Sequence, residues 1–250
     1  MVAVPYVIGL VCLAGIVAGA CLGSFIAALT LRWPQGRSIA TGRSMCENCH
    51  RTLTAFDLVP IVSYLALAGA CRACRAPIGN RQLVIEVTAG AIGGLSLAIS
   101  PDTTGAVGAV FGWALLPLLV LDIEHFWLPD RLTWPLAAGG IIAAWLTQAD
   151  VAMRLVGLVA GFASLWLVAA LYKRLTGRVG IGGGDPKLFA AIGAWLGPQG
   201  LPYVLVLAGI FGLIMAAFSR WRGTDIDRQT PLAYGALMAT AAWPLWFFVS

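Results

Sequence analysis

Residues 4–31 form an uninterrupted apolar run without a single charged side chain. A helix needs about 20 apolar residues to cross the hydrocarbon core of a membrane, and this run exceeds that length. It is also too long for the hydrophobic part of a cleavable signal peptide, and no positively charged segment precedes it. We therefore expect the run to be a transmembrane helix rather than a signal peptide.

Seven further apolar runs follow the first one. The composition agrees with a membrane protein, since 60% of the residues are hydrophobic and only 11% are charged, against about 25% charged in a soluble domain. We predict an all-α polytopic membrane protein with about eight transmembrane helices, one of which (187–198) is short enough to be a half-helix. The seven runs cover residues 83–100, 104–121, 132–148, 151–172, 187–198, 201–218 and 232–249.

Glycines recur at every fourth position of the first run, as Gly15, Gly19 and Gly23. Small residues at this spacing allow two membrane helices to approach closely. The pattern predicts that this face of the first helix packs against another helix.

If each of the eight runs crosses the membrane once, almost all basic residues lie on one side of it. Of the 16 lysines and arginines, 15 lie in or beside the loops of one face, and Arg154 is the exception. The positive-inside rule makes that face cytoplasmic. The net charge of +5 then reflects topology, and we expect no nucleic-acid partner.

The segment 32–82 is the one long polar stretch, and it contains two C-x-x-C units separated by 21 residues. Paired units of this kind are typical of zinc ribbons, in which four thiolates close a tetrahedral shell. A small cytosolic loop domain has only a small hydrophobic core and needs a bound metal ion to stabilise it, because disulfides are disfavoured in the cytosol. We predict a structural Zn²⁺ site in this loop domain, or a loop that has lost its metal. The ligands would be Cys46, Cys49, Cys71 and Cys74.

Three segments follow from these observations. They are a first transmembrane helix (1–31), a cytosolic loop domain with four cysteines (32–82) and a seven-helix membrane domain (83–250).

Acidic residues at the ends of membrane helices are functional candidates, because burying a charge there is costly. Asp122 and Asp185 border apolar runs at the same membrane face. Each has a simpler explanation: Asp122 could mark a membrane boundary, while Asp130 and Asp185, which precedes Pro186, could cap helices. Two carboxyl groups held close together instead share one proton. Such a pair supplies the general base and general acid for hydrolysing a peptide bond with water.

The residues around these aspartates form two motifs. They read Asp122-x-Glu124-x-x-x-Leu128-Pro129-Asp130 and Gly182-x-Gly184-Asp185-x-Lys187-Leu188. The glycines allow a close backbone approach to a substrate, and the ammonium group of Lys187 would favour the ionised form of Asp185.

Together with Gly23-Ser24-Phe25, Arg32-x-Pro34, the paired C-x-x-C units and Glu86, these motifs cover most of the chain. In this combination the chain resembles the prepilin peptidases, or type IV leader peptidases, among the GxGD intramembrane aspartic proteases. The resemblance implies that Asp122 and Asp185 are the catalytic pair. It also implies cleavage of prepilins or type II secretion pseudopilins after their short basic leader, at the cytosolic face of the bacterial inner membrane.

The charges of the sequence are compatible with a basic leader. Glu124 and Asp130 could hold it, while Asp225 and Asp227, on the last cytosolic loop, are weaker candidates and more simply solvated loop residues. Gly182, Gly184, Lys187 and Glu86 would support the site.

Many family members also methylate the new amino terminus with S-adenosylmethionine, a function associated with the N-terminal half. Here the chain departs from the family's pattern. Ala27 stands where the family has Asn, and Gln82-Leu83 stands where it has Tyr-Pro. The sequence therefore leaves N-methylation open.

Two other classes of membrane protein are compatible with parts of this sequence. An ion- or proton-coupled transporter would carry its carboxylates near the midpoints of its helices, whereas here they gather at one face. A membrane scaffold with a zinc module for docking partners would use the aspartates only as helix caps. The sequence predicts neither a particular pilin substrate nor an oligomeric state.

Overall fold

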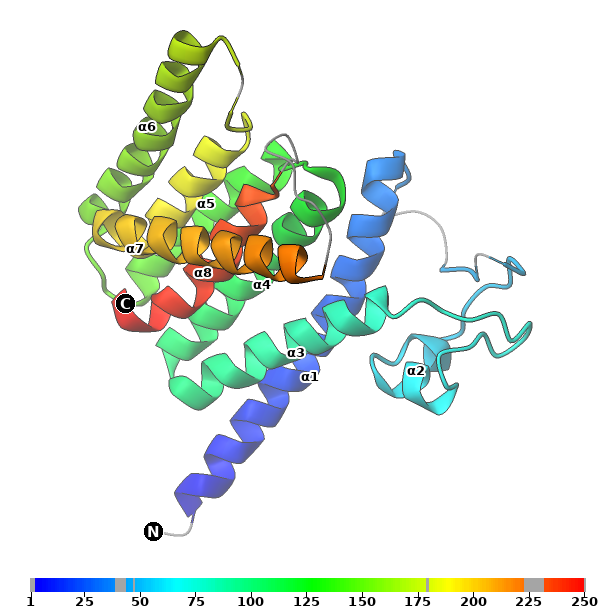
Figure 1. The fold of residues 1–250 in the computed structure, drawn as a ribbon. Helices are drawn as coiled ribbons and strands as arrows, with labels where there is room; N and C mark the ends of the chain where they lie inside the picture. Colours follow the sequence, from blue (N-terminus) through cyan, green and yellow to red (C-terminus); the bar gives the residue numbers. More distant parts are fainter. Residues whose placement is uncertain (1–2, 39–43, 47, 179, 223–231, 250) are drawn as a thin grey trace. The chain divides into compact units, whose positions relative to one another are not determined.

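The computed structural model describes residues 3–38, 44–46, 48–178, 180–222 and 232–249, and helices are the dominant secondary structure in these ranges (Figure 1). Within these ranges the only β-structure is two isolated bridges. The chain divides into two compact units, Met1–Trp113 and Ala114–Ser250. The all-α prediction is confirmed.

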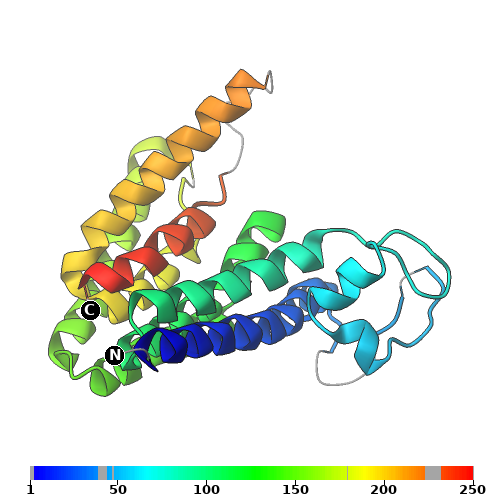
Figure 2. The same ribbon diagram turned by 90° about the horizontal axis from the view of Figure 1, so that it is seen from below.

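The first unit is built on two long helices that lie side by side, α1 (Ala3–Arg32) and α3 (Arg81–Ile99) (Figures 1 and 2). A Cβ atom added at Gly15 would lie 2.7 Å from the carbonyl oxygen of Gly93. One added at Gly23 would lie 2.7 Å from the Cα of Glu86. Because no side chain fits between the backbones, the predicted close packing through Gly15, Gly19 and Gly23 is confirmed.

Between these helices the chain forms a small loop region with short helical turns. The first part of α4 (Thr103–His125) completes the unit. The short elements are η1 (Trp33–Gln35), η2 (Ala55–Leu58) and α2 (Val62–Ala66).

The second unit contains the rest of α4 and four further helices. Its core is the first segment of α7, where Leu188, Ile192 and Leu196 are fully buried. The indole Nε1 of Trp195 donates a hydrogen bond of 2.7 Å to the carbonyl oxygen of Leu136 on α5. The helices are α5 (Asp130–Leu146), α6 (Val151–Thr176), α7 (Asp185–Trp221) and α8 (Tyr234–Val249).

Helix α7 departs from the expected arrangement. The apolar runs 187–198 and 201–218 predicted two helices with a loop at 198–200, but the structure has one element interrupted at Gly197 (φ 72°, ψ 177°). Glycine tolerates a positive φ, and the following Pro198 is suited to the first position of a helix. A single residue therefore replaces the expected loop.

The prediction of about eight membrane helices is otherwise confirmed. Among the described residues there are seven long helices, and the break in α7 divides one of them into two segments. Five of the seven are long and apolar enough to cross a membrane, namely α1, α3, α4, α6 and α7, and α8 is a shorter apolar helix.

Candidate active site and metal centre

Asp122 and Asp185 come together in the second unit. Both side chains are buried, with exposed fractions of 5% and 8%. Asp122 lies in the last turn of α4, and Asp185 is the first residue of α7. The two carboxyl groups lie close enough to interact electrostatically. Tyr234, at the start of α8, is also close enough to Asp185 for an electrostatic interaction.

The first turn of α8 holds the carboxylate of Asp122. The backbone amide of Ala236 donates a hydrogen bond of 2.7 Å to Oδ2 of Asp122. The first amides of a helix have no partner within the helix and bind anionic groups. Asp122 is thus more than the boundary of an apolar run, because it is held by a helix far along the chain.

Asp185 closes a turn on the residues that precede it. The amide of Gly182 donates a hydrogen bond of 3.0 Å to Oδ2 of Asp185, and the N-cap of α7 is Gly184. The side chain of Asp185 therefore does not cap α7, as the simpler explanation required. Asp130 does not cap its helix either, because the N-cap of α5 is Pro129. By contrast, Asp150 does cap α6, accepting from the amides of Ala152 and Met153.

The three consecutive glycines before Asp185 have different surroundings. A Cβ atom at Gly184 would lie 2.8 Å from the Cβ of Leu128, and one at Gly182 would lie 3.1 Å from Oδ2 of Asp185. A Cβ atom at Gly183 would meet nothing within 4 Å. Leu128 also faces Gly235, where a Cβ would lie 2.8 Å from the leucine Cδ1 and 2.9 Å from Oδ2 of Asp122. Leu128 thus fills the space beside both aspartate-bearing segments.

Lys187 forms an ion pair with Asp130 rather than with the neighbouring Asp185. Its Nζ lies 2.7 and 2.8 Å from the two carboxylate oxygens of Asp130. This pair joins the first turn of α7 to the first turn of α5. Its observed partner is thus Asp130, where we had expected it to act on Asp185.

Of the remaining acidic candidates, the structure describes Glu124. It is exposed, two residues beyond Asp122 on α4. Asp225 and Asp227 lie outside the described residues.

The four cysteines of the loop region come together in the first unit. Their sulfur atoms all lie within 4.8 Å of one another, and one pair, Sγ of Cys46 and Sγ of Cys74, is 3.8 Å apart. Four thiolates about 2.3 Å from a tetrahedral ion would be about 3.8 Å apart. The four cysteines could therefore hold a metal ion.

The two C-x-x-C units have the same local structure. The amide of Cys46 bonds to the carbonyl of Arg51 at 2.9 Å, and the amide of Cys71 bonds to that of Ala76 at 2.9 Å. The residue after each second cysteine, His50 or Arg75, has a positive φ. Each unit is thus a tight turn that presents both of its sulfur atoms to the same side.

Glu86 belongs to the first unit, whereas Asp122 and Asp185 belong to the second. It is 97% buried and accepts a 2.7 Å hydrogen bond from the amide of Ile61 in the loop region. The side-chain amide of Gln82 donates to Glu86 at 3.0 Å and to the hydroxyl of Ser24 at 3.3 Å. Nearby, Arg81 donates to the carbonyl of Ala27 at 3.1 Å. Two positions that depart from the family's pattern, Ala27 and Gln82, thus border one polar cluster.

Sequence reasoning did not identify the start of α8 as part of the site. The only local signal was Gly235, a glycine in the first turn of an apolar run. The contacts of Tyr234, Gly235 and Ala236 with the aspartates depend on the packing of α8 beside α4 and α7.

Comparison with known protein families gives two matches. The model of the bacterial Peptidase A24 N-terminal domain matches residues 17–99. The model of the type IV leader peptidase family matches residues 109–217.

Comparison with curated proteins gives several relatives with the name "Prepilin leader peptidase/N-methyltransferase". The relative from Burkholderia pseudomallei (strain 1026b) is 39% identical over 218 residues, which cover 86% of this chain and 70% of the relative. The relative from Aeromonas hydrophila is 34% identical over 206 residues, covering 80% and 70%. The relative from Pseudomonas aeruginosa is 36% identical over 203 residues, covering 80% and 69%. No solved structure matches significantly. The chain belongs to the type IV leader peptidase family.

Proposed function

We propose that this multi-pass membrane protein is an aspartic endopeptidase that removes the short basic leader of type IV prepilins or type II secretion pseudopilins. Asp122 and Asp185 would be its catalytic pair. The observation that carries the proposal is the meeting of two buried carboxyl groups, from α4 and α7, in a single cluster. Relatives named for the same activity match over most of the chain, and nothing favours a transporter.

The reaction follows from a pair of carboxyl groups that shares one proton. The ionised carboxylate removes a proton from a water molecule, whose oxygen attacks the carbonyl carbon of the scissile bond. The protonated carboxyl group then donates its proton to the amide nitrogen as the carbon–nitrogen bond breaks. The products are a shortened pilin with a free amino terminus and the released leader.

The position of the pair suits a bond at the membrane surface. The first segment of α7, from Asp185 to Leu196, contains 12 residues and is about 18 Å long. The hydrocarbon core is about 30 Å thick. The two ends of this segment therefore cannot lie at opposite membrane surfaces. With its Gly197 end at one surface, its Asp185 end would lie within the membrane, where it would reach a bond at the edge of a substrate's membrane helix.

The charges around the site support recognition of a basic leader. Glu124 is exposed beside Asp122 and would bind a basic side chain, while Asp130 would act through its pair with Lys187. The distribution of basic residues supports a bacterial inner-membrane protein whose aspartates and cysteine loop face the cytoplasm.

The metal of the cysteine loop is proposed to be Zn²⁺. Its support is the set of four thiols within 4.8 Å of one another, with one pair at the 3.8 Å expected of two ligands on a tetrahedral ion. The ion would hold the loop together and leave no open position for chemistry. Metal analysis of freshly purified, reduced protein should give about one zinc per chain. Cys71→Ser should lose it, whereas Cys21→Ser, an exposed cysteine of α1, should keep it. A metal-free wild-type protein would remove the zinc proposal.

The second activity named for the relatives, N-methylation, would use S-adenosylmethionine as methyl donor. We assign it to the polar cluster of Ser24, Gln82 and Glu86, in the half of the chain that matches the N-terminal domain model. Ala27 and Gln82 depart from the family's pattern there, so this activity needs a direct measurement.

One experiment tests both activities. A type IV prepilin is co-expressed with the protein, and the amino terminus of the recovered pilin is analysed by mass spectrometry. We expect a pilin cut between its basic leader and its hydrophobic helix, and the mass of the new terminus reports whether a methyl group has been added. Uncleaved prepilins and pseudopilins in cells that contain the membrane-inserted wild-type protein would overturn the proposed function.

A further inference from the structure

Arg154, in the first turn of α6, is a buried charge without a polar partner among the described residues. Its exposed fraction is 6%. The structure gives its guanidinium group no hydrogen bond and no ion pair with any described residue. The guanidinium carbon lies 5.9 Å from the centroid of the Trp246 ring. A buried, unpaired charge at a membrane helix is costly and calls for a functional explanation.

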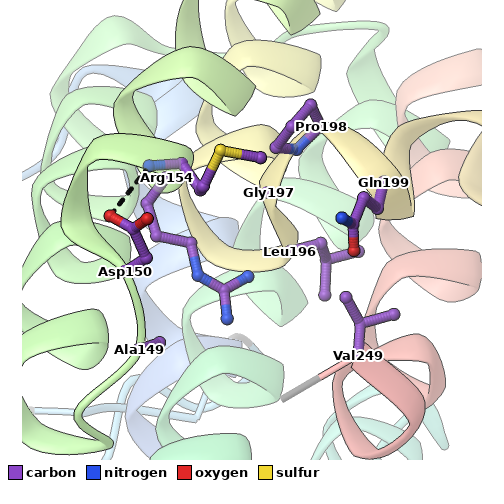
Figure 3. A pocket seen from close by; sticks show the side chains of 9 residues that line it. Ala149, Asp150, Arg154, Leu196, Gly197, Pro198, Gln199 and Val249 are labelled. Carbon is purple, nitrogen blue, oxygen red and sulfur yellow. Dashed lines mark hydrogen bonds between the residues drawn. The ribbon is translucent and has the colours of Figure 1, made fainter.

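The guanidinium group points into a cavity of about 200 Å³ (Figure 3). The cavity lies where α5 ends, α6 begins, α7 breaks and α8 ends. Asp185 begins α7 and Asp122 contacts the start of α8, whereas the cavity is lined by residues at the break of α7 and the end of α8, so it is separate from the candidate active site. Its lining includes Asp150, Arg154, Gly197, Pro198, Gln199 and Val249.

The one acidic group in the lining does not neutralise Arg154. Oδ1 of Asp150 accepts hydrogen bonds of 2.8 and 3.4 Å from the amides of Ala152 and Met153. This carboxylate therefore caps α6, and no ion pair joins it to Arg154.

The break in α7 leaves room beside Arg154 and adds polar groups. A Cβ atom at Gly197 would lie 3.6 Å from Nη1 of Arg154, so glycine keeps this side of the guanidinium open. The second segment of α7 begins at Pro198, and the start of a helix carries partial positive charge. The side-chain amide of Gln199 supplies a further donor at the same edge.

We propose that this cavity is a binding site for a phosphate-type oxyanion, carried by a lipid headgroup or free in solution. A guanidinium fork donates two parallel hydrogen bonds to such an anion and compensates its charge. The cavity volume of about 200 Å³ corresponds to about seven water molecules at their liquid volume, which is sufficient for a phosphate group. Its location at the end of four helices, opposite the aspartates, suits a headgroup at the membrane surface.

The test is the thermal stability of the purified protein in detergent at constant ionic strength. One arm adds inorganic phosphate, a second adds phosphatidylglycerol, and a third adds diacylglycerol, which has no phosphate. We expect Tm to rise with phosphatidylglycerol and not with diacylglycerol. If inorganic phosphate raises Tm by the same amount, a small anion is sufficient for binding. If inorganic phosphate leaves Tm unchanged, the lipid headgroup is the source of the bound anion.

Variants tie the effect to the site. Arg154→Gln should lose the rise in Tm, and Arg154→Lys, which keeps the charge but not the fork, should bind about tenfold more weakly. Arg174→Gln, an exposed arginine near the other end of α6, should behave as the wild type. The proposal is overturned if wild-type Tm responds to neither phosphate nor phosphatidylglycerol. It is also overturned if folded Arg154→Gln responds as strongly as the wild type.

Discussion

The backbone amide of Ala236 donates a 2.7 Å hydrogen bond to Oδ2 of Asp122, across 114 positions of the chain. This contact makes the start of α8 part of the candidate active site. Gly235 is required for it, because a Cβ atom there would lie 2.9 Å from the same oxygen. The site is therefore assembled from three helix ends: the last turn of α4 and the first turns of α7 and α8.

Replacing either aspartate by asparagine should abolish cleavage while the protein still folds. Asn occupies almost the same volume but cannot exchange a proton, so Asp122→Asn and Asp185→Asn should each lower the cleavage rate by about 100-fold or more. The rate is measured on co-expressed prepilin by gel electrophoresis. Asp150→Asn is the matched control, because Asn caps a helix about as well as Asp. Mature pilin at wild-type rate from both site variants would contradict the catalytic assignment.

The glycines before Asp185 should differ in their tolerance of a methyl group. Gly184→Ala should be destabilising by about 1–3 kcal/mol, because its Cβ would overlap Leu128 at 2.8 Å. Cleavage should fall with it, since Gly184 directly precedes Asp185 and Leu128 also packs beside Gly235, next to Asp122. Gly183→Ala should change stability by less than about 0.5 kcal/mol, because nothing lies within 4 Å. Thermal unfolding and a cleavage assay measure both effects, and equal behaviour of the two variants would refute the packing argument.

We expect the ion pair of Lys187 and Asp130 to position the first turn of α7 for catalysis and to contribute little to the stability of the fold. Both side chains are partly exposed, at 37% and 52%, so the pair should contribute at most about 1 kcal/mol. Lys187→Gln and Asp130→Asn should each reduce kcat several-fold, and the double variant should be no worse than either single one. Lys173→Gln, at an exposed lysine of α6, is the control. Fully additive losses in kcat would show that the two residues act independently.

We expect ionised Asp57 to stabilise the loop region, and this stabilisation to be lost only at unusually low pH. The amide and hydroxyl of Thr54, and then the Arg72 guanidinium, hold the pKa of Asp57 at about 2, below its ordinary 3.8. A lowered carboxyl pKa stabilises the folded state above the ordinary value, and this contribution disappears as the pH falls through about 2.

Hydrogen exchange of residues 54–58, corrected for intrinsic rates, measures this contribution. Wild type should be better protected than Asp57→Asn at neutral pH, and the difference should shrink between about pH 4 and pH 2. Asp102→Asn, which alters the Asp102 contact to the amide of Thr104, should leave this segment unchanged. A difference that is constant down to pH 2 would contradict the role of the carboxylate.

The sequence by itself predicted the membrane helices and the metal-ligand cluster. The run 4–31 became α1 (Ala3–Arg32), and 151–172 became α6 (Val151–Thr176), because a long apolar stretch has no other stable conformation in a membrane. The four cysteines were identifiable since each C-x-x-C unit places two sulfur atoms on one turn within a few residues. These are local properties, which a chain carries wherever it folds.

The tertiary structure decided the contacts that turn single acidic residues into a site. The pairing of Lys187 with Asp130, the hydrogen bond of Ala236 to Asp122 and the unpaired guanidinium of Arg154 have no local signature in the sequence. The break at Gly197 reads as a loop in the sequence and is a single residue in the structure. Each of these features depends on how helices distant in sequence pack. Such packing is set by the shapes of whole helix faces, not by the polarity of one residue.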